Sequence, residues 1–319
     1  MHCKMKEMKK ILIIGGTGFI GQNLSCRLIE RGYDVTICAR RKIGFSFPYE
    51  GKYHFIQSDI FFEDTLDPIL LKFDYVFYLV CSMKPAASIK DITFGYEKDI
   101  TTLIHLLDII KHGSTRLVFI SSGGTVYGSH WGNSMTENMQ TFPINHYGIL
   151  KLTQEKIIAM YNEKYHMKNI IFRVSNPYGH GQKRASGIGA VTVFLEAILS
   201  GQTIKIYGDG NTIRDYIYIS DVVEMIIQYI EKSICVDRVP IYNIGTGVGT
   251  SLNMLVGILE NITGEKASIE YDVKRDVDVE RNVLSTDKIK RVIGDYQCVS
   301  LANGVKEYYK IIEKERIQC

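Results

Sequence analysis

Long hydrophobic runs are absent from this sequence of 319 residues. Apolar runs such as Ile11–Ile14 are far shorter than the roughly 20 residues that cross a bilayer. The basic N-terminus leads into a predicted strand and a glycine-rich turn, without the apolar core of a signal peptide. We therefore expect a cytoplasmic protein with no membrane partner.

The sequence also has little excess of either charge, and its cysteines form no paired motif. The 38 Lys and Arg residues nearly balance the 35 Asp and Glu residues, and a formal net charge of +3 is too small to predict a nucleic-acid surface. The seven cysteines lack CxxC and metal-ligand spacing, which is typical of core thiols in a reducing compartment. The sequence thus predicts no metal site and no nucleic-acid partner.

The first half of the chain alternates short β-branched runs with stretches of helical spacing, a pattern typical of parallel sheets. Strands are predicted at residues 11–14, 35–38, 53–57, 75–80, 117–121 and 170–174. Helices are predicted at about 22–31, 99–111 and 145–165. We therefore predict an α/β fold with a Rossmann-type doubly wound parallel sheet, whose ligand lies at the carboxyl ends of the strands.

The second half is less regular, because glycine-rich stretches separate its short elements. This pattern predicts a smaller, discontinuous α/β lobe for the substrate. We expect residues 1–174 and about 213–244 to form the dinucleotide-binding domain. Residues 175–212 and 245–319 are expected to form the substrate lobe.

A glycine-rich turn follows the first predicted strand, with Gly15, Gly18 and Gly21 three residues apart. The first glycine permits the tight turn, the second lets the backbone approach a pyrophosphate, and the third lets the helix pack on the strand. The helix N-terminus directs its free N–H groups at the phosphates. We therefore predict that this turn, with Phe19 and Ile20, binds a dinucleotide.

No carboxylate ends the second predicted strand, where NAD enzymes usually hold the ribose 2′-hydroxyl. Arg40 and Arg41 follow that strand instead, and arginines there can bind a 2′-phosphate or stack on adenine. NAD is the expected cofactor, and NADP stays open. Asp59, which precedes Ile60 after the third strand, is predicted either to accept a hydrogen bond from adenine or to cap the following turn.

Tyr147 and Lys151 lie four residues apart in a predicted helix, and therefore on one face of it. A phenol ionises near pH 10 when unperturbed, and a nearby ammonium and an oxidised nicotinamide ring favour the phenolate. The phenolate can accept a hydroxyl proton while hydride leaves the same carbon. The pair follows the dinucleotide turn and a strand that leads into Ser121–Gly128, and it predicts redox chemistry at an alcohol carbon.

With these motifs the chain resembles the extended short-chain dehydrogenases/reductases, in the NAD-dependent epimerase/dehydratase group, and is most similar to UDP-glucose 4-epimerases. The resemblance extends from Ile11 to about Tyr309 and implies a nucleotide-sugar substrate and a homodimer. The residues that it implies for substrate binding are Asn176, Arg214, Arg275 and Asp278, together with Thr125. Those that complete the expected cofactor site are Ile60, Val80, Ser121, Pro177 and Tyr178.

One residue of the catalytic pattern is missing. Related epimerases carry Ser or Thr where this chain has Gly123, and that hydroxyl relays a proton to the tyrosine. Thr125 or Ser122 can supply a hydroxyl instead, or Tyr147 can contact the sugar directly; we favour Thr125. Residues 123–125 also lack the Thr-Asp-Glu of the related dehydratases, so elimination of water has no catalysts.

The leading hypothesis is a 4-epimerase of UDP-Glc/Gal or UDP-GlcNAc/GalNAc type, serving polysaccharide biosynthesis by transient oxidation at C4. The alternative is a reductase of an NDP-4-keto-6-deoxysugar that uses exchangeable NADPH, which Arg40 and Arg41 support. A third reading is a non-catalytic dinucleotide sensor. Both Tyr147 and Lys151 are present, which argues against that reading.

Overall fold

A computed structural model describes residues 8–42, 48–83, 89–128, 134–182, 189–232, 240–274 and 279–318. The chain divides into two compact units. The first unit comprises Met1–Ser121, Leu150–Phe172 and Cys235–Ile241, and the second comprises Ser122–Ile149, Arg173–Ile234 and Tyr242–Cys319. Within the described ranges, no helix is both long enough and apolar enough to cross a membrane.

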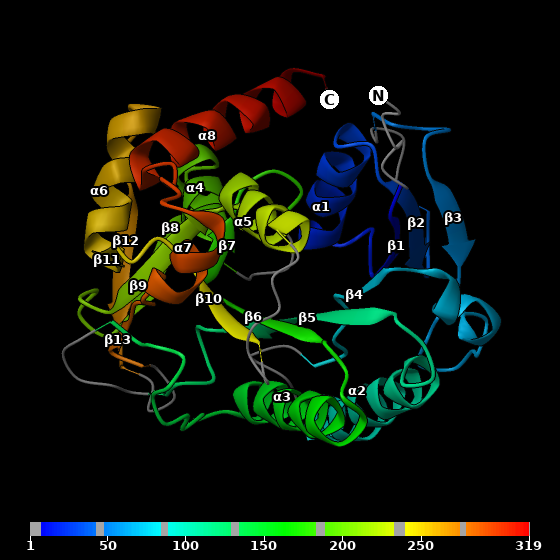
Figure 1. The fold of residues 1–319 in the computed structure, drawn as a ribbon. Helices are drawn as coiled ribbons and strands as arrows, with labels where there is room; N and C mark the ends of the chain where they lie inside the picture. Colours follow the sequence, from blue (N-terminus) through cyan, green and yellow to red (C-terminus); the bar gives the residue numbers. More distant parts are fainter. Residues whose placement is uncertain are drawn as a thin grey trace. The chain divides into compact units, whose positions relative to one another are not determined.

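The main sheet of the described chain has the strand order β10-β6-β5-β4-β1-β2-β3 (Figure 1). Its strands are β1 (Lys10–Ile14), β2 (Asp34–Ala39), β3 (His54–Gln57), β4 (Tyr75–Tyr78), β5 (Arg116–Ser122), β6 (Ile170–Val174) and β10 (Ile241–Ile244). β1 pairs in parallel with β2 and with β4, β2 with β3, and β4 with β5. The winding reverses between β1 and β4, where such sheets bind ligands. The predicted doubly wound parallel sheet is confirmed.

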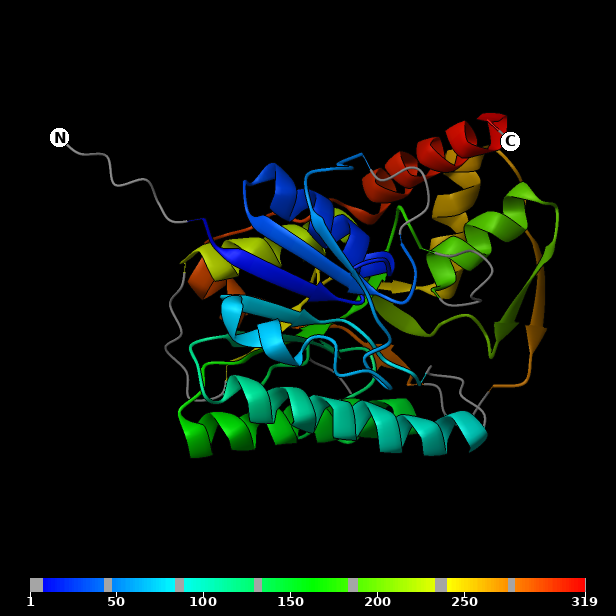
Figure 2. The ribbon, with the colours of Figure 1, turned by 90° about the vertical axis from the view of Figure 1, so that its right-hand side faces the viewer.

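Helices cover the strands of the first unit on both faces, which explains why Ile11–Ile14 and Tyr75–Tyr78 are fully buried. α1 (Phe19–Glu30) lies on one face. α2 (Ile89–Ile110) and α3 (His146–Tyr165) lie side by side along the other (Figures 1 and 2). The Tyr161 hydroxyl of α3 donates a hydrogen bond to Asp108 of α2 (2.8 Å). A short 3-10 helix, η1 (Asp67–Lys72), precedes β4.

Two elements differ from the sequence prediction. α2 begins at Ile89 rather than near residue 99. Gly95 weakens the helical pattern in the sequence, and in the helix a Cβ at this position would lie 2.7 Å from Cε of Met83. Among the described residues, the main sheet also contains β10, a seventh strand that the sequence did not predict. Asn243 interrupts its apolar pattern, yet this side chain is fully buried, because its amide donates to the carbonyls of Met135 and Ser285.

The second unit is built around β9 (Ile213–Tyr218), which pairs in parallel with β7 (Asn176–Tyr178) and β13 (Arg281–Asn282) and antiparallel with β11 (Gly249–Ser251). β8 (Thr203–Tyr207) pairs in parallel with β12 (Ser268–Asp272). α6 (Leu252–Thr263) packs against α4 (Ala190–Leu199) and α8 (Leu301–Gln318), and α5 (Ile219–Lys232) packs against α7 (Asp287–Ile293). Side chains on β9 are thus bordered by strands on both sides.

Candidate active site

The glycine turn joins β1 to α1 at the switch point of the sheet. Gly15 has a φ of +85°, and a Cβ there would lie 2.9 Å from Cγ1 of Val80 at the end of β4. A Cβ on Gly21 would collide with the carbonyl oxygen of Gly15. Gly18 precedes α1 and supplies no side-chain cap, and the first turn of α1 contains no acidic residue. These features leave the helix N-terminus suited to a pyrophosphate, so the turn fits a dinucleotide.

The carboxyl end of β2 has a carboxylate beside it that the sequence analysis missed. Arg40 and Arg41 are exposed after β2. The backbone N–H of Ser58 donates to the carbonyl of Ala39 (3.1 Å), and its hydroxyl donates to Glu63 (2.8 Å). Glu63 therefore lies near the strand end, although it follows β3 in the sequence. Nothing in the local sequence around Glu63 indicated that its carboxylate would lie near the end of β2.

Asp59 stands at the start of the loop that follows β3. Its Oδ1 accepts a hydrogen bond from the backbone N–H of Phe61 (3.2 Å), so the carboxylate caps this turn. Burial raises the pKa of the nearby Cys38 thiol to about 12, and the charges of Glu63 and Asp59 add to the increase. The contact between Asp59 and adenine stays a prediction, as does the role of Ile60.

Lys151 is buried in the first unit, with 4% of its surface exposed. Its Nζ donates to the carbonyl oxygen of Ile120 (3.1 Å) and lies 4.6 Å from the centre of the Phe119 ring. Both residues belong to β5, so the ammonium is held at the carboxyl end of that strand. A buried ammonium is costly unless negative charge or acceptors surround it.

Asp99 of α2 supplies negative charge near Lys151, and the sequence analysis missed it. Its carboxylate is fully buried and accepts hydrogen bonds from the backbone N–H (3.0 Å) and the hydroxyl of Ser82. Gln154 of α3 donates to its backbone carbonyl (3.2 Å). Burial raises the pKa of Asp99, and the Ser82 hydrogen bonds and the charge of Lys151 oppose the increase. Its spacing from the buried Leu103, four residues on, was the available signal.

Glu155 lies one helical turn after Lys151 and also anchors α3 to β5. It is 1% exposed, and its Oε1 accepts a hydrogen bond from the Ser121 hydroxyl (2.5 Å). Ser121 was predicted to bind the cofactor. Because its hydroxyl donates to Glu155, the Ser121 oxygen could meet the cofactor only as an acceptor.

Tyr147 is half-buried in the first turn of α3, within the second unit. The Asn145 side chain accepts a hydrogen bond from the backbone N–H of Gly148 (2.8 Å) and so caps the helix. A Cβ on Gly148 would lie 2.8 Å from the carbonyl oxygen of Thr125, so this turn packs closely on the loop after β5. Tyr147 and Lys151 lie one turn apart along α3, as the spacing predicts.

The hydroxyl of Thr125 is buried and has no hydrogen-bond partner among the described residues. A buried, unpaired hydroxyl costs about 1–3 kcal/mol, and the hydroxyls of Tyr78, Ser175 and Tyr216 share this state among the described residues. Ser122 lies on the same loop, with its Oγ 3.8 Å from the Cβ position of Gly124. The choice between Thr125 and Ser122 as the source of the hydroxyl stays a prediction.

Gly123 is a glycine because Leu284 occupies the space beside it. A Cβ on Gly123 would lie 2.5 Å from Cδ1 of Leu284 and 3.1 Å from the carbonyl oxygen of Arg173. The Gly123 carbonyl also accepts a hydrogen bond from the buried Asn282 side chain (2.9 Å). The serine of related epimerases therefore does not fit here without movement of Leu284.

Gly123→Ser is expected to destabilise the chain by about 1–3 kcal/mol, because it overpacks the contact with Leu284. In a Leu284→Ala background, where the space is open, the same substitution should cost less. Urea denaturation of the four chains of this double-mutant cycle measures the coupling. Equal costs in both backgrounds would show that Leu284 does not exclude a side chain at this position.

Asn176 and Arg214, both predicted to bind substrate, lie on the neighbouring strands β7 and β9. The Asn176 amide donates to the backbone carbonyl of Asp215 (3.1 Å). Nη1 of Arg214 donates to the carbonyls of Ile213 (2.9 Å) and Val279 (2.6 Å). Arg275 and Asp278 lie outside the described residues. Sequence reasoning gave no role to Asp215.

Tyr178 points into the interior of the second unit. It is 1% exposed, and its hydroxyl donates to the carbonyl of Leu301 (3.3 Å). Its ring centre lies 5.5 Å from that of Tyr218. Pro177 is half-buried. Of the Pro177–Tyr178 pair predicted to border the nicotinamide, Pro177 is the one whose side chain keeps an exposed surface.

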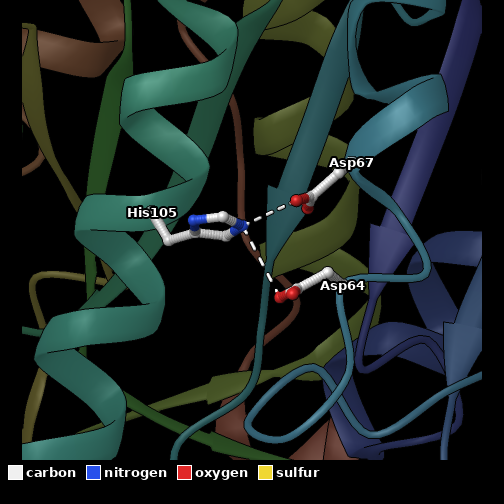
Figure 3. A group of neighbouring side chains, drawn as sticks. All are labelled: Asp64, Asp67 and His105. Atoms are coloured by element: carbon white, nitrogen blue, oxygen red, sulfur yellow. Dashed lines mark hydrogen bonds and ion pairs between the residues drawn. The ribbon is translucent and has the colours of Figure 1, made fainter.

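One group of potential metal ligands occurs among the described residues, at Asp64, Asp67 and His105 (Figure 3). Nε2 of His105 lies 2.9 Å from Asp67 and 3.7 Å from Asp64. The imidazole and the Asp64 carboxylate are exposed. His105 is in the last two turns of α2 and Asp67 begins η1, so the contact links these helices on the surface.

The sequence and the fold both match known proteins. A model of the NAD dependent epimerase/dehydratase family matches residues 11–245. The chain is 29% identical over 304 residues to UDP-glucose 4-epimerase of Mycolicibacterium smegmatis, covering 93% of this chain and 96% of that protein. Its structure is similar to that of UDP-glucose 4-epimerase from Thermotoga maritima with UDP-glucose (TM-score 0.86, 31% identity, 96% of this chain and 99% of that chain). The Thermus thermophilus UDP-glucose 4-epimerase complex with NAD gives a TM-score of 0.85 at 25% identity, over 95% and 99% of the two chains.

Proposed function

Because this chain belongs to the NAD-dependent epimerase/dehydratase family, we propose that it is a nucleotide-sugar 4-epimerase that uses NAD. The observation that carries the proposal is the placement of Lys151. Its buried ammonium is fixed to the carboxyl end of β5, one helical turn after Tyr147 and in the same unit as the glycine turn. The full-length similarity to UDP-glucose 4-epimerases of known structure supports it.

When bound, NAD⁺ would supply a reversible hydride acceptor for the sugar C4. Tyr147 takes the O4 proton as a phenolate and returns it to the 4-keto sugar. Lys151 keeps the phenol acidic by its positive charge, and Asp99 balances that charge. Thr125 offers its unpaired hydroxyl to the sugar, and Ser122 is the other candidate.

The nucleotide-sugar diphosphate is bound by the second unit in this proposal. Arg214 carries a guanidinium, whose positive charge suits a diphosphate, and Asn176 lies on the adjoining strand. Arg275 and Asp278 complete the site by family resemblance. The first unit holds the dinucleotide through Gly15, Gly18 and Gly21 in this assignment.

We further propose that the enzyme works in the cytoplasm, as a homodimer, in polysaccharide biosynthesis. Cys26, Cys38, Cys81 and Cys298 are free thiols, which suits a reducing compartment. Ile149 and Met160 of α3 are 41% and 49% exposed. These apolar side chains support a contact between two copies through α2 and α3.

Cofactor analysis and a substrate panel test this function. Purified protein is expected to release about one NAD per chain on denaturation, and to interconvert UDP-glucose and UDP-galactose, or their N-acetyl counterparts, without added cofactor. UDP-sugars and an NDP-4-keto-6-deoxysugar are each assayed with and without NADPH. A protein purified without NAD that oxidises NADPH with the keto sugar would instead be a reductase, the reaction that Arg40 and Arg41 would serve.

A further inference from the structure

Asp215 is a buried carboxylate that the proposed reaction does not use. It is fully buried, and its Oδ1 accepts hydrogen bonds from the Thr246 backbone N–H (2.9 Å) and hydroxyl (2.7 Å). Its Oδ2 accepts from the backbone N–H groups of Gly247 (3.2 Å) and Leu284 (3.2 Å). Burial raises the pKa of Asp215, and these hydrogen bonds oppose the increase. Each carboxylate oxygen thus accepts two donors.

These hydrogen bonds join three segments of the second unit. Residues 246–247 lead into β11, Leu284 follows β13, and both strands flank β9, which carries Asp215. Gly245 also packs closely, because a Cβ there would lie 2.5 Å from Oδ2 of Asp215. The carboxylate therefore fixes the ends of both neighbouring strands against β9.

The same segments carry the side chains assigned to the diphosphate. Arg214 precedes Asp215 in β9 and is in register with Thr250 of β11 and Asn282 of β13. Its Nη1 bonds to the carbonyl of Val279, just before β13. The backbone carbonyl of Asp215 accepts the Asn176 amide. A shift of β11 or β13 would therefore move Arg214, and a shift of Asp215 would release Asn176.

We infer that Asp215 is a positioning residue for nucleotide-sugar binding, which holds β9, β11 and β13 together so that Arg214 and Asn176 meet the diphosphate jointly. The inference rests on the proposed function for the identity of this ligand. A carboxylate is required because all four partners are donors. An amide would turn its own N–H groups toward two of them.

Asp215→Asn is expected to weaken UDP binding about tenfold to a hundredfold, the cost of a misplaced binding group, and to raise the KM for UDP-glucose similarly. The kcat should fall less than about threefold, and the bound NAD should be unchanged because the glycine turn that holds its pyrophosphate lies in the first unit. Calorimetric titration with UDP and steady-state kinetics measure these quantities. In an Arg214→Gln background, Asp215→Asn should cost less than in wild type, because the part of its effect that passes through Arg214 is already lost and only the part that passes through Asn176 remains.

Asp221→Asn is the matched control. Asp221 is 1% exposed in the same unit and accepts hydrogen bonds from the Tyr296 hydroxyl (2.8 Å) and the Val299 N–H (2.9 Å). Its loss should lower stability without changing UDP affinity. If Asp215→Asn fails to fold, Thr246→Val removes one hydrogen bond of Asp215 and should weaken UDP binding, whereas Thr246→Ser should preserve it.

A failure of the positioning role of Asp215 and a failure of the proposed function would give different results. Unchanged UDP affinity in Asp215→Asn or Thr246→Val, or an equal loss in Asp221→Asn, would overturn the positioning role alone. A wild-type chain that retains NAD but binds no UDP or other nucleoside diphosphate would overturn the proposed function, and this inference with it.

Discussion

Tyr147→Phe is expected to lower kcat about a thousandfold, within the range of 10²–10⁴ that a positioned acid or base contributes. The substitution removes only the phenolic hydroxyl and keeps the half-buried ring, so the fold and the bound NAD should persist. Coupled assays of UDP-sugar interconversion measure the loss, and release of NAD from the denatured protein measures its content. The loss should appear in kcat and kcat/KM together, because the proton transfer occurs only in the transition state.

Tyr161→Phe is a matched control on the same helix. Its hydroxyl donates to Asp108 of α2 (2.8 Å), away from the carboxyl ends of the strands. The control should lose about 0.5–1.5 kcal/mol of unfolding free energy and keep wild-type turnover. Tyr147→Phe with turnover near that of wild type would sink the catalytic assignment, whichever sugar is used.

The parts of the site that lie close together in the sequence could be predicted from it. Ile11–Ile14 is continuously apolar because β1 is buried on both faces, and Gly15, Gly18 and Gly21 follow it directly. Tyr147 and Lys151 share one helix. Each of these features depends on a spacing within one element or one turn, so local periodicity is enough to predict it.

The roles of the buried carboxylates Asp99 and Asp215 could not be predicted, because their partners are distant in the chain. Asp99 gains its role from Ser82 and Lys151, and Asp215 from Thr246 and Leu284. In the sequence each acid directly follows a basic residue, Lys98 before Asp99 and Arg214 before Asp215, and so resembles one half of a surface ion pair. Only tertiary packing brings their partners to them; the helical spacing between Asp99 and Leu103 indicates a buried face of the helix but not which groups bind the carboxylate.

Two residue types that the family pattern leads one to expect are missing from this chain. The missing hydroxyl at Gly123 was evident, but its cause, Leu284, lies in another part of the chain. The missing acid after β2 left NADP open beside the expected NAD; the family is NAD-dependent, and Glu63 places a carboxylate near that strand end. A missing residue type therefore indicates function only when the structure shows what has replaced it.

Gly21→Ala is expected to remove most of the bound NAD and to lower activity at least about a hundredfold, the cost of misplacing a binding element. A Cβ at this position would collide with the Gly15 carbonyl oxygen and lie 2.7 Å from Gly16 Cα. Both are backbone atoms, so no side-chain rotation relieves the contact and α1 must move away from β1. The phosphate-binding turn then loses its shape. NAD content after purification, and the NAD-dependent rise in Tm, measure the effect.

Gly257→Ala separates this steric effect from helix propensity. Gly257 lies within α6, and nothing lies within 4 Å of its Cβ position. Alanine is favoured over glycine by about 1 kcal/mol inside a helix, and Gly21 in α1 would gain the same. The control should therefore be slightly more stable than wild type and keep its NAD. If Gly21→Ala also keeps its NAD, the close approach of α1 to the glycine turn is not what forms the dinucleotide site.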